Sequence, residues 1–387
     1  MDKDYEIICG ITLNRIFGYE PAAARRIVGT FGSPGAVFSQ SSETLDSAFG
    51  PYSKYRALIC RQELDASAAE WASLEASGCR FVNIGTPGSP PLLAECPDAP
   101  VGLYIRSATP PEQLWTGMRS VSVVGTRDIS PYGKDWTERI VKALSLAKHK
   151  PMIVSGFAIG VDITAHLAAL AFGLPTAAVI PVGIDSIYPW RHRHVAELLA
   201  GTPGCAIVTD FPPGTQPAAF NFLRRNRIIA GMSECTILAE SKAKGGGTMT
   251  ARLAASYGRD LYCLPGRIDD VRSAGCNRLI AEKLAEPIPD LESLPAQMGL
   301  GPRRRFTQQS LEDRLGECYA HSGKENLDTI LRVAGAIREQ RGITLEEICR
   351  ALQIDYGKVS AAVCLLESDG FVSTDFLRRC SIDNKKL

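Results

Sequence analysis

Several signatures that would assign a function directly are missing from this 387-residue sequence. Its twelve cysteines include no C-x-x-C pair and follow no regular spacing, so neither a zinc site nor a disulfide framework is indicated. His192 and His194 stand two residues apart without a third ligand, a pattern more typical of surface residues than of a metal centre. We therefore expect no metal site.

The signatures of common nucleotide cofactors are missing as well. A dinucleotide fingerprint needs G-x-G-x-x-G after the first strand, where this chain reads GTRDIS, and no P-loop string G-x-x-x-x-G-K-[ST] occurs. Asp162 and Asp185 fall in different loops, and His166 is interpreted as a buried polar residue. Because no nucleophile, base and orienting group come together, we expect neither a cofactor nor catalytic turnover.

Long apolar runs and a strong charge imbalance are absent too. No run approaches membrane-spanning length, and the start MDKDYEIICGITLNRIFG lacks a basic segment followed by a long apolar core. We therefore expect a soluble, cytoplasmic protein that does not bind membranes. The formal net charge is +1, so any anion site must come from locally clustered cations.

The sequence divides into three regions and a linker that differ in residue composition and in hydrophobic pattern. Residues 1–76 are predicted to form a small helical domain, because short helical patterns there are punctuated by Gly and Pro. Residues 77–295 alternate short apolar runs with helical patterns. Residues 296–323 form a polar linker containing GPRRRFTQQS, and residues 324–387 form a compact helical set.

The apolar runs of the middle region are rich in β-branched residues and do not alternate, which favours strands buried on both faces. The helical patterns between them imply right-handed βαβ crossovers, so we predict a Rossmann-like open parallel α/β sheet. The strand candidates are VSVVG (121–125), MIVSG (152–156), TAAVI (176–180), CAIVT (205–209), CTILAE (235–240) and DLYCLPG (260–266).

The last region predicts three helices and a hairpin, which is the outline of a winged helix-turn-helix. Thr344 and Glu347 form a capping box for the second helix. The third helix follows Asp355 and carries Lys358 as its only basic residue, whereas helices that read duplex DNA usually carry several. We therefore expect a protein-contact module or a weak DNA-binding module.

An anion site is predicted at the carboxyl ends of the strands. The loops GTR, SGFAIGVD and KAKGGGT contain small residues that let backbone N–H groups approach an oxyanion. A helix predicted to start near Asn221, its N-cap, places Arg224, Arg225 and Arg227 at its positive end. Because the arginines fan across almost half of the helix, we expect that one acid such as Asp210 cannot neutralise all three.

These strings occur together, in the same order and spacing, in a known family. VVGTRDISPYG, IVSGFAIGVDITAH, FPPGTQP, FLRRNRIIAGMS and GGGTMTARLA resemble the DNA-processing protein A family, also called DprA or Smf, over about residues 77–287. The first region resembles the family's sterile-alpha-motif or helix-hairpin-helix domain, and the last region resembles its winged helix.

The resemblance implies a recombination mediator and not an enzyme. Such a protein protects incoming single-stranded DNA, dimerises through its Rossmann-like domain, and loads RecA during natural transformation and homologous recombination. Single-strand-binding protein, which coats the strand, is a further implied partner. The positions that match the family's phosphate-binding motifs are Gly125, Thr126, Arg127, Ser155, Gly156, Arg224, Arg225, Asn226, Arg227, Gly246, Gly247 and Thr248.

This chain departs from the family pattern at three places. Ile159 stands where the family usually has a polar residue, and His192 replaces an asparagine, although its ring can still donate to a phosphate. The turn GYEP (18–21) replaces a glycine-rich turn, which argues against direct DNA binding by that region. Phe220 and Phe222 are candidates for stacking on bases.

Two other functions stay open at this point. A phosphoribohydrolase with a related fold also holds a nucleoside monophosphate in a glycine-threonine loop, but its catalytic acid and arginine form a tight string that this chain lacks. A nucleotide-sensing regulator would use its winged helix to bind duplex promoters, and the weakly basic third helix argues against that role.

Overall fold

The structure is a computed structural model that describes residues 3–301, 315–316, 318–320, 322–340, 342–375 and 379–382. The chain divides into two compact units, Met1–Arg304 and Arg305–Leu387. Most of the expected linker, including its three successive arginines, lies outside the described residues. Within those residues, none of the helices combines the length and the apolar character needed to cross a membrane.

The first unit opens with α-helices that share a small apolar core. Phe17 stands at its centre, with ring centroids 6.0 Å from Phe49 and 4.6 Å from Tyr55. The first helix has two apolar faces, because Leu13 packs into this core while Ile11 packs towards the sheet. The helices are α1 (Lys3–Phe17), α2 (Pro21–Phe31), α3 (Pro34–Phe38), α4 (Ser42–Phe49) and α5 (Arg61–Ala76), with a 3-10 turn at Arg56–Leu58.

A nine-stranded sheet forms the centre of this unit, in the order β1-β2-β6-β5-β4-β3-β7-β8-β9. All six strand candidates from the sequence are strands, and they pair in parallel. They are β3 (Ser120–Gly125), β4 (Met152–Ser155), β5 (Thr176–Val179), β6 (Ala206–Thr209), β7 (Cys235–Glu240) and β8 (Asp260–Cys263).

One edge of the sheet corrects the expectation of a purely parallel arrangement. The strands β1 (Cys79–Asn83) and β2 (Gly102–Arg106) pair antiparallel with each other, and β2 pairs antiparallel with β6. The short strand β9 (Glu286–Pro287) extends the opposite edge in parallel. Gly102 opens β2 because the Phe81 ring lies over it, leaving no room for a Cβ atom.

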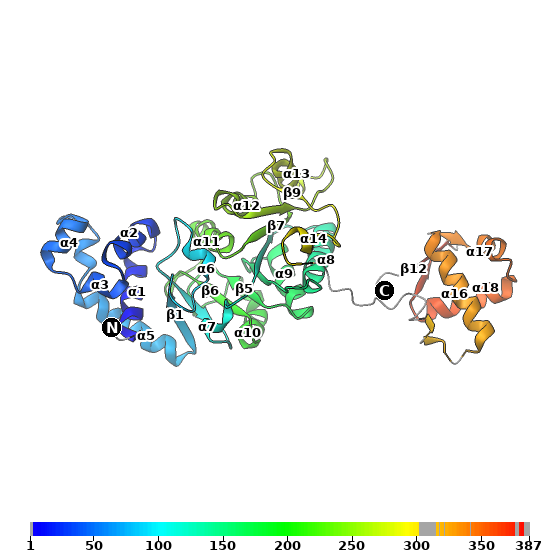
Figure 1. Cartoon of the computed structure of the whole chain (residues 1–387), viewed down its shortest axis with the longest axis horizontal. Helices are drawn as coiled ribbons and strands as arrows, with labels where there is room; N and C mark the ends of the chain where they lie inside the picture. The colour runs from blue at the N-terminus through cyan, green and yellow to red at the C-terminus, as the bar shows by residue number, and fades with distance from the viewer. Residues whose placement is uncertain are drawn as a thin grey trace. The chain divides into compact units, whose positions relative to one another are not determined.

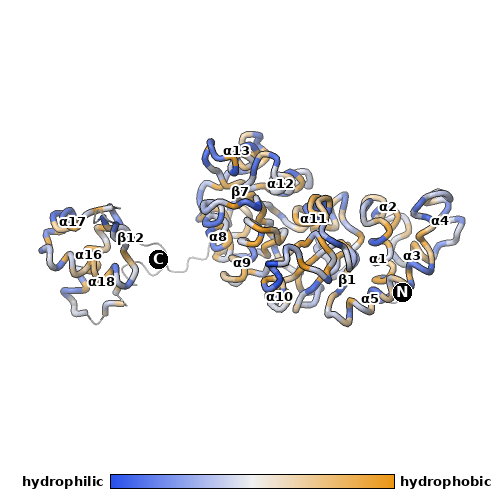
Figure 2. The backbone as a smooth tube through the Cα atoms, turned by 180° about the vertical axis from the view of Figure 1, so that it is seen from behind, coloured by the Kyte–Doolittle hydropathy of each residue, from blue (hydrophilic) through white to orange (hydrophobic). Residues whose placement is uncertain are grey.

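Helices cover both faces of the sheet (Figure 1). One face packs its apolar side chains against α11, α12 and α13, and the other packs against α8, α9, α10 and α14. Figure 2 shows the apolar strands enclosed between these layers. The helices are α6 (Pro91–Ala94), α7 (Pro111–Leu114), α8 (Pro131–Ser145), α9 (Val161–Ala171), α10 (Arg193–Gly201), α11 (Ala219–Gly231), α12 (Gly246–Ser256), α13 (Ala274–Ala281) and α14 (Leu294–Gln297), with a 3-10 turn at Trp190–His192.

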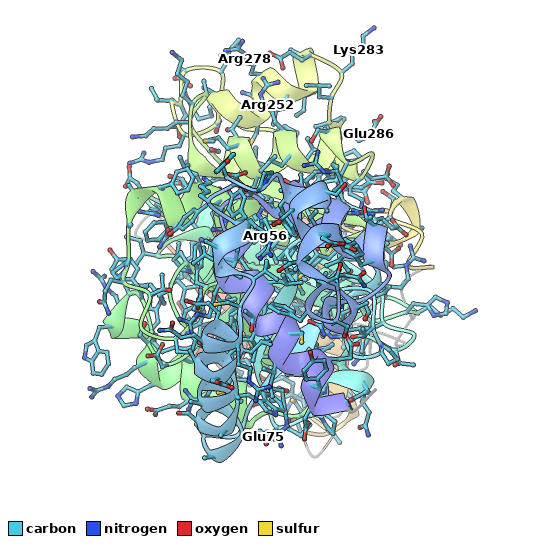
Figure 3. All side chains as sticks on the ribbon, turned by 90° about the vertical axis from the view of Figure 1, so that its left-hand side faces the viewer. Arg56, Glu75, Arg252, Arg278, Lys283 and Glu286 are labelled. Carbon is cyan, nitrogen blue, oxygen red and sulfur yellow. The ribbon has the colours of Figure 1, made fainter. Side chains whose placement is uncertain are left out.

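Charged side chains cover the outer ends of the same unit. Figure 3 shows Arg278 and Lys283 pointing away from the body of the molecule, near Arg252. Arg252 and Arg278 both contact Glu282, at N–O distances of 2.7 Å each, and all three side chains are partly exposed. This cluster is an ordinary surface ion pair network, and such pairs contribute little to stability.

The described part of the second unit is built on the helices α16, α17 and α18 and a small antiparallel sheet. The predicted capping box is present, since the Thr344 hydroxyl accepts from the Glu347 N–H while the Glu347 carboxylate accepts from the Thr344 N–H. Val359 and Leu366 lie in the core that the helices enclose. The elements are α16 (Lys324–Glu339), α17 (Leu345–Leu352), α18 (Tyr356–Ser368), β10 (Ile343–Thr344), β11 (Val372–Thr374) and β12 (Arg379–Ile382), with sheet order β10-β12-β11.

A buried histidine lies behind the loop that follows β4. The Thr176 hydroxyl donates its single proton to the Ile153 carbonyl at 2.7 Å, so it accepts a hydrogen bond from Nδ1–H of His166, also at 2.7 Å. The other ring nitrogen, Nε2, has no partner among the described residues. Burial, with a smaller contribution from Arg225, lowers the pKa of His166 to about 3.

Acid is therefore expected to unfold the first unit partly through His166. The unfolded chain protonates this ring near its ordinary pKa of 6.5, whereas the folded chain resists protonation until about pH 3. The contribution of neutral His166 to the free energy of unfolding is fully present above pH 6.5. Between pH 6.5 and about 3 it is lost as pH falls, by about 1.4 kcal/mol per pH unit. Urea denaturation from pH 7 to 4 will show a shallower loss for His166→Gln, whereas His149→Gln, at an exposed position, will follow the wild type. Equal slopes for His166→Gln and the wild type would contradict this assignment.

Candidate functional site

The strand order reverses between β3 and β7, and a pocket of about 350 Å³ opens at the carboxyl ends of these two strands. This is the position at which open α/β sheets bind their ligands. Loops after β3, β4 and β7 form its walls together with α11 and α12. The lining residues are Val124, Gly125, Thr126, Arg127, Asp128, Ala158, Asp162, Arg225, Asn226, Ile229, Ser241, Lys242, Gly245, Gly246, Gly247 and Thr250.

The starts of α8 and α12 lie beside this pocket, and their first turns differ in what they bind. The carboxylate of Glu240, at the end of β7, accepts from the Ser130 N–H at 2.8 Å and from the Ser130 hydroxyl at 2.6 Å, so it occupies the start of α8. No side chain caps the start of α12, where Gly245 is the N-cap residue. The free N–H groups of that turn and the helix dipole favour an anion in the pocket.

Close backbone packing fixes the start of α12 against the loop after β3. A Cβ atom on Gly247 would lie 2.8 Å from the Gly125 Cα atom, and a Cβ atom on Gly125 would lie 2.6 Å from the Glu240 carbonyl oxygen. A Cβ atom on the neighbouring Gly246 would meet nothing within 4 Å. Glycine is therefore required at 125 and 247 by packing, whereas 246 tolerates a larger residue.

Gly247→Ala is expected to lower the free energy of unfolding of the first unit by about 1–3 kcal/mol, because the added methyl group overpacks a backbone contact. Gly246→Ala, at the neighbouring position of the same turn, is the matched control. It is expected to leave the stability unchanged or slightly raised, because alanine is the better helix former. Urea denaturation of the two variants measures the difference, and an equal effect of both would contradict the packing argument.

Arg225 forms the base of the pocket as a buried cation. It is 3% exposed, donates to the Val179 carbonyl oxygen at 2.8 Å, and forms no ion pair with any described carboxylate. Burial lowers its pKa to about 10, so the guanidinium stays charged at neutral pH. Burial also raises the pKa of nearby Asp162, while Arg225 opposes that shift.

Gly156 makes room for this pair of charges. A Cβ atom there would lie 1.8 Å from an Arg225 Nη1 atom and 2.6 Å from an Asp162 Oδ2 atom. The residue thus lies beneath Arg225 and supports the pocket without lining it. Ser155 and Thr248, also expected at the site, point elsewhere: their hydroxyls donate to the Val123 and Lys242 carbonyls.

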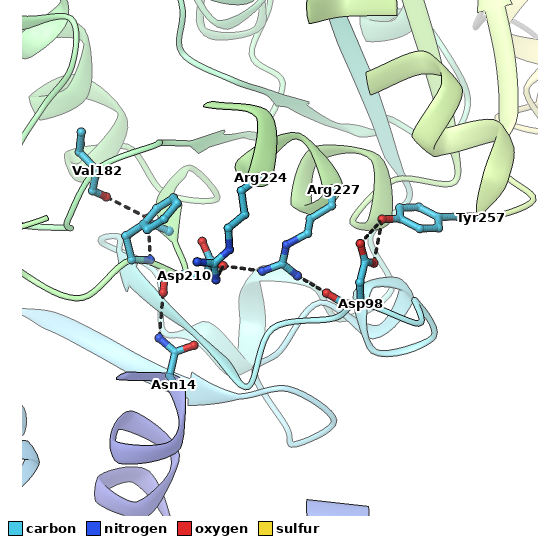
Figure 4. Close-up of polar contacts among 9 residues, drawn as sticks. Asn14, Asp98, Val182, Asp210, Arg224, Arg227 and Tyr257 are labelled. Atoms are coloured by element: carbon cyan, nitrogen blue, oxygen red, sulfur yellow. Dashed lines mark hydrogen bonds and ion pairs between the residues drawn. The ribbon is translucent and has the colours of Figure 1, made fainter. Parts of the chain in front are cut away.

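As expected, one acid does not neutralise all three arginines of α11, but Arg224 and Arg227 do not line the pocket, which corrects their predicted place. Arg224 and Arg227 both contact the same Oδ2 atom of buried Asp210, at 2.9 and 2.5 Å, as Figure 4 shows. Arg227 also donates to the Asp98 carbonyl, and Asn14 of α1 donates to the Asp210 carbonyl at 2.8 Å. Neither arginine lines the pocket. One acid contacts both because residues three apart share a helix face, whereas Arg225 points to a different side.

The start of α11 also differs from the prediction. The helix begins at Ala219, and its N-cap residue Ala218 makes no side-chain cap. Asn221, the expected N-cap, lies inside the first turn, where its side-chain amide donates to the Gln216 carbonyl at 3.2 Å. His192, considered as a phosphate donor, is buried and places Nδ1 3.0 Å from the Phe157 carbonyl oxygen.

The lining residues that were not selected from the sequence include Lys242 and Asp162. Lys242 directly precedes the glycine-rich turn, and its proximity to that turn was the available signal. Asp162, placed by the sequence in a different loop from Asp185, lines the pocket near Arg225. The pocket brings together Gly125, Thr126, Arg127, Arg225, Asn226, Gly246 and Gly247 of the expected set.

Aromatic rings border the pocket on the side of α11. The guanidinium carbon of Arg127 lies 4.5 Å from the ring centroid of Phe222. Tyr188 meets Phe222 edge-on at 5.5 Å. An arginine placed over an aromatic face is held by attraction to the ring's π electrons, so Arg127 is positioned although it has no carboxylate partner among the described residues.

Comparison with known proteins gives consistent results over this part of the chain. Residues 80–299 match the sequence model of the family described as DNA recombination-mediator protein A. A Smf protein from Synechocystis is 30% identical over 315 residues, which cover 76% of this chain and 78% of the relative. DNA processing protein DprA from Streptococcus pneumoniae is 37% identical over 190 residues, covering 49% of this chain and 64% of the relative.

Two solved structures resemble the fold. The X-ray structure of DNA processing protein A from Streptococcus pneumoniae superposes with a TM-score of 0.64 at 27% identity, covering 77% of this chain and 99% of that one. DNA processing protein A from Helicobacter pylori, described for its single-stranded DNA binding mode, has a TM-score of 0.50 at 28% identity and covers 57% of this chain and 95% of that one.

Proposed function

The chain belongs to the DNA recombination-mediator protein A family, and on that premise we propose that it binds single-stranded DNA and delivers it to a recombinase. The strand's phosphates enter the pocket at the β3–β7 switch point. There they meet Arg127, Arg225 and Lys242, the amides of the α12 turn, and the Asn226 side chain. The pocket recognises the polynucleotide backbone, so binding is independent of sequence and sensitive to salt.

The observation that carries this proposal is that Arg225 is buried at the pocket with Asp162 nearby but with no carboxylate within ion-pair distance among the described residues. A guanidinium that is almost fully buried, and has no carboxylate in ion-pair contact among the described residues, gains most from an incoming anion. An uncapped helix start faces the same space. These two features together favour a phosphate over a neutral ligand.

A mobility-shift experiment tests the proposal directly. Single-stranded and double-stranded DNA of equal length and mixed sequence are each titrated with the full chain at several salt concentrations. We expect stable complexes with the single strand at concentrations where the duplex stays free, and a loss of binding as salt rises. Preference for the duplex, or binding that is insensitive to salt, would overturn the proposal.

Further parts of the proposal concern partners and domains. We infer that the chain dimerises through residues 77–295 and loads RecA onto strands coated by single-strand-binding protein, in natural transformation and recombination. Residues 1–76 then act as a helical domain of the sterile-alpha-motif or helix-hairpin-helix type, and residues 324–387 act as a winged helix beyond the linker 296–323. Faster RecA filament assembly on coated strands in the presence of the chain tests the loading step.

The phosphoribohydrolase alternative is less well supported. That activity needs a catalytic acid beside the sugar, and the carboxyl group of Asp162 in this pocket is buried against Arg225. We propose a role without chemical turnover, in which the protein holds and releases a strand. Incubation of purified protein with AMP tests this directly, because release of free adenine would favour the enzyme.

A further inference from the structure

Two aromatic side chains form an exposed pair outside the pocket. Tyr19, in the turn between α1 and α2, and Phe220, in the first turn of α11, have ring centroids 6.0 Å apart at an angle of 34°. Tyr19 is 66% exposed and Phe220 is 59% exposed. A contact made only to join the helical region to the sheet region would bury these rings, and their exposure needs another explanation.

The pair is held in place from below. The guanidinium carbon of Arg224 lies 4.7 Å from the Tyr19 ring centroid and 5.1 Å from that of Phe211. Arg224 is itself fixed by its ion pair with buried Asp210. One face of the Tyr19 ring therefore packs on a guanidinium whose position is fixed. A ring that is already held in place loses little conformational entropy when a ligand stacks on it.

An apolar surface connects this pair to the pocket. On the surface of α11, Leu223 lies between Phe222 and Phe220. It is turned by about 100° from Phe222 about the helix axis, and it neighbours Phe220 because residues three apart share a helix face. Leu223 is exposed, and Phe222 is half-buried beneath the Arg127 side chain that lines the pocket. A strand that leaves the pocket past Arg127 thus meets Phe222, Leu223, Phe220 and Tyr19 in succession.

From this arrangement we propose that Tyr19 and Phe220 form a base-stacking platform that carries the single strand from the pocket onto the helical region. The inference rests on the proposed function and extends it, because it assigns DNA contact to the GYEP turn through a ring and not through backbone amides. Nucleobases fit the surface because every base has a flat face that stacks on an aromatic ring without sequence preference.

The test compares the variant Tyr19→Ala/Phe220→Ala with the wild type by fluorescence anisotropy. The probes are labelled oligothymidines of about 6 and about 20 nucleotides, chosen to fill the pocket alone or to reach beyond it. We expect the variant to bind the longer strand about tenfold more weakly and the shorter strand unchanged. Tyr52→Ala is the control, because Tyr52 is an exposed tyrosine of the same helical region with no ring contact to a described residue.

A second probe separates stacking from charge. A strand of about 20 abasic sugar-phosphate units retains the backbone but lacks the bases, so the wild type and the double variant should bind it equally. In addition, the tryptophan introduced by Phe220→Trp should be quenched when a base of the longer oligothymidine stacks on it. The tryptophan introduced by Tyr52→Trp should not be quenched, and the wild type gives the signal of the four native tryptophans.

Four outcomes would overturn the inference. Unchanged affinity of the double variant for the longer strand would leave the pair as a surface for another protein. Equal weakening on the short strand would mean that the rings only position α11, and equal weakening on the abasic strand would mean that bases are not involved. A wild type that binds neither oligothymidine would overturn the proposed function and this inference together.

Discussion

Asp210→Ala is expected to lower the free energy of unfolding of the first unit by about 3–5 kcal/mol, because it leaves two buried guanidinium groups without their shared carboxylate. Asp210 is almost fully buried, and Arg224 and Arg227 both bond to its Oδ2 atom. No other described carboxylate contacts either arginine. Urea denaturation followed by far-UV circular dichroism at neutral pH will measure the change.

Glu282 provides a control of the same chemistry at the surface. It also contacts two arginines, Arg252 and Arg278, but all three side chains are partly exposed. Glu282→Ala should therefore leave the unfolding curve almost unchanged, since water and salt screen such pairs. If both variants shifted the curve equally, burial would not explain the importance of Asp210.

The variant Asp210→Asn and the double variant Asp210→Asn/Arg227→Met test why stability is lost when the Asp210 carboxylate is removed. In Asp210→Asn the shape is kept while the charge is removed, so the two arginines stay uncompensated. Adding Arg227→Met replaces one of them by an apolar side chain of similar length and is expected to recover part of the stability. Further destabilisation by the second substitution would show that packing around Arg227, and not its charge, dominates.

Arg225→Ala is expected to weaken binding of oligothymidine by about ten- to hundredfold, the loss that follows when a charge-assisted hydrogen bond to phosphate is removed. The same variant should reduce the slope of log affinity against log salt by about 0.7, since one phosphate contact disappears from a single strand. Arg225→Lys keeps the charge but not the planar fork, and it should retain the slope while recovering only part of the affinity.

Arg139→Ala is the matched control for Arg225. Arg139 is an exposed arginine of α8 whose guanidinium carbon lies 4.4 Å from the Trp136 ring centroid, and it does not line the pocket. Its removal should change neither affinity nor salt slope. Unaltered values in Arg225→Ala, with the fold verified by its urea midpoint, would defeat the assignment of Arg225 to a phosphate.

The sequence predicted the centre of the sheet better than its edges. Continuous β-branched runs such as VSVVG leave little alternative to a strand buried on both faces, and β3 and β7 were found where expected. The edge strand β1 (CRFVN) mixes one exposed arginine with buried residues, and β2 begins with a glycine that its partner strand requires. Their pairing depends on contacts distant in sequence, which no local pattern encodes.

The arginine cluster shows the same limit at the site. Arg225 lies in the pocket as expected, but its neighbours Arg224 and Arg227 do not. Their spacing of three residues places them on one helix face, so the sequence did contain a signal for a shared acid. The sequence could not supply the location of Asp210. This residue lies 14 and 17 positions before Arg224 and Arg227, and the fold of the chain places it beneath α11.

The carboxylate that Glu240 places at the start of α8 limits which nucleotides this scaffold accepts. Redox dinucleotides such as NAD and FAD set their pyrophosphate against the first crossover helix of a Rossmann-type sheet. Here that landing place already holds a negative charge belonging to the protein itself, which would repel the pyrophosphate. This helix start is therefore unfavourable for a dinucleotide, whereas the start of α12 carries no capping side chain and suits a phosphate of a polymer.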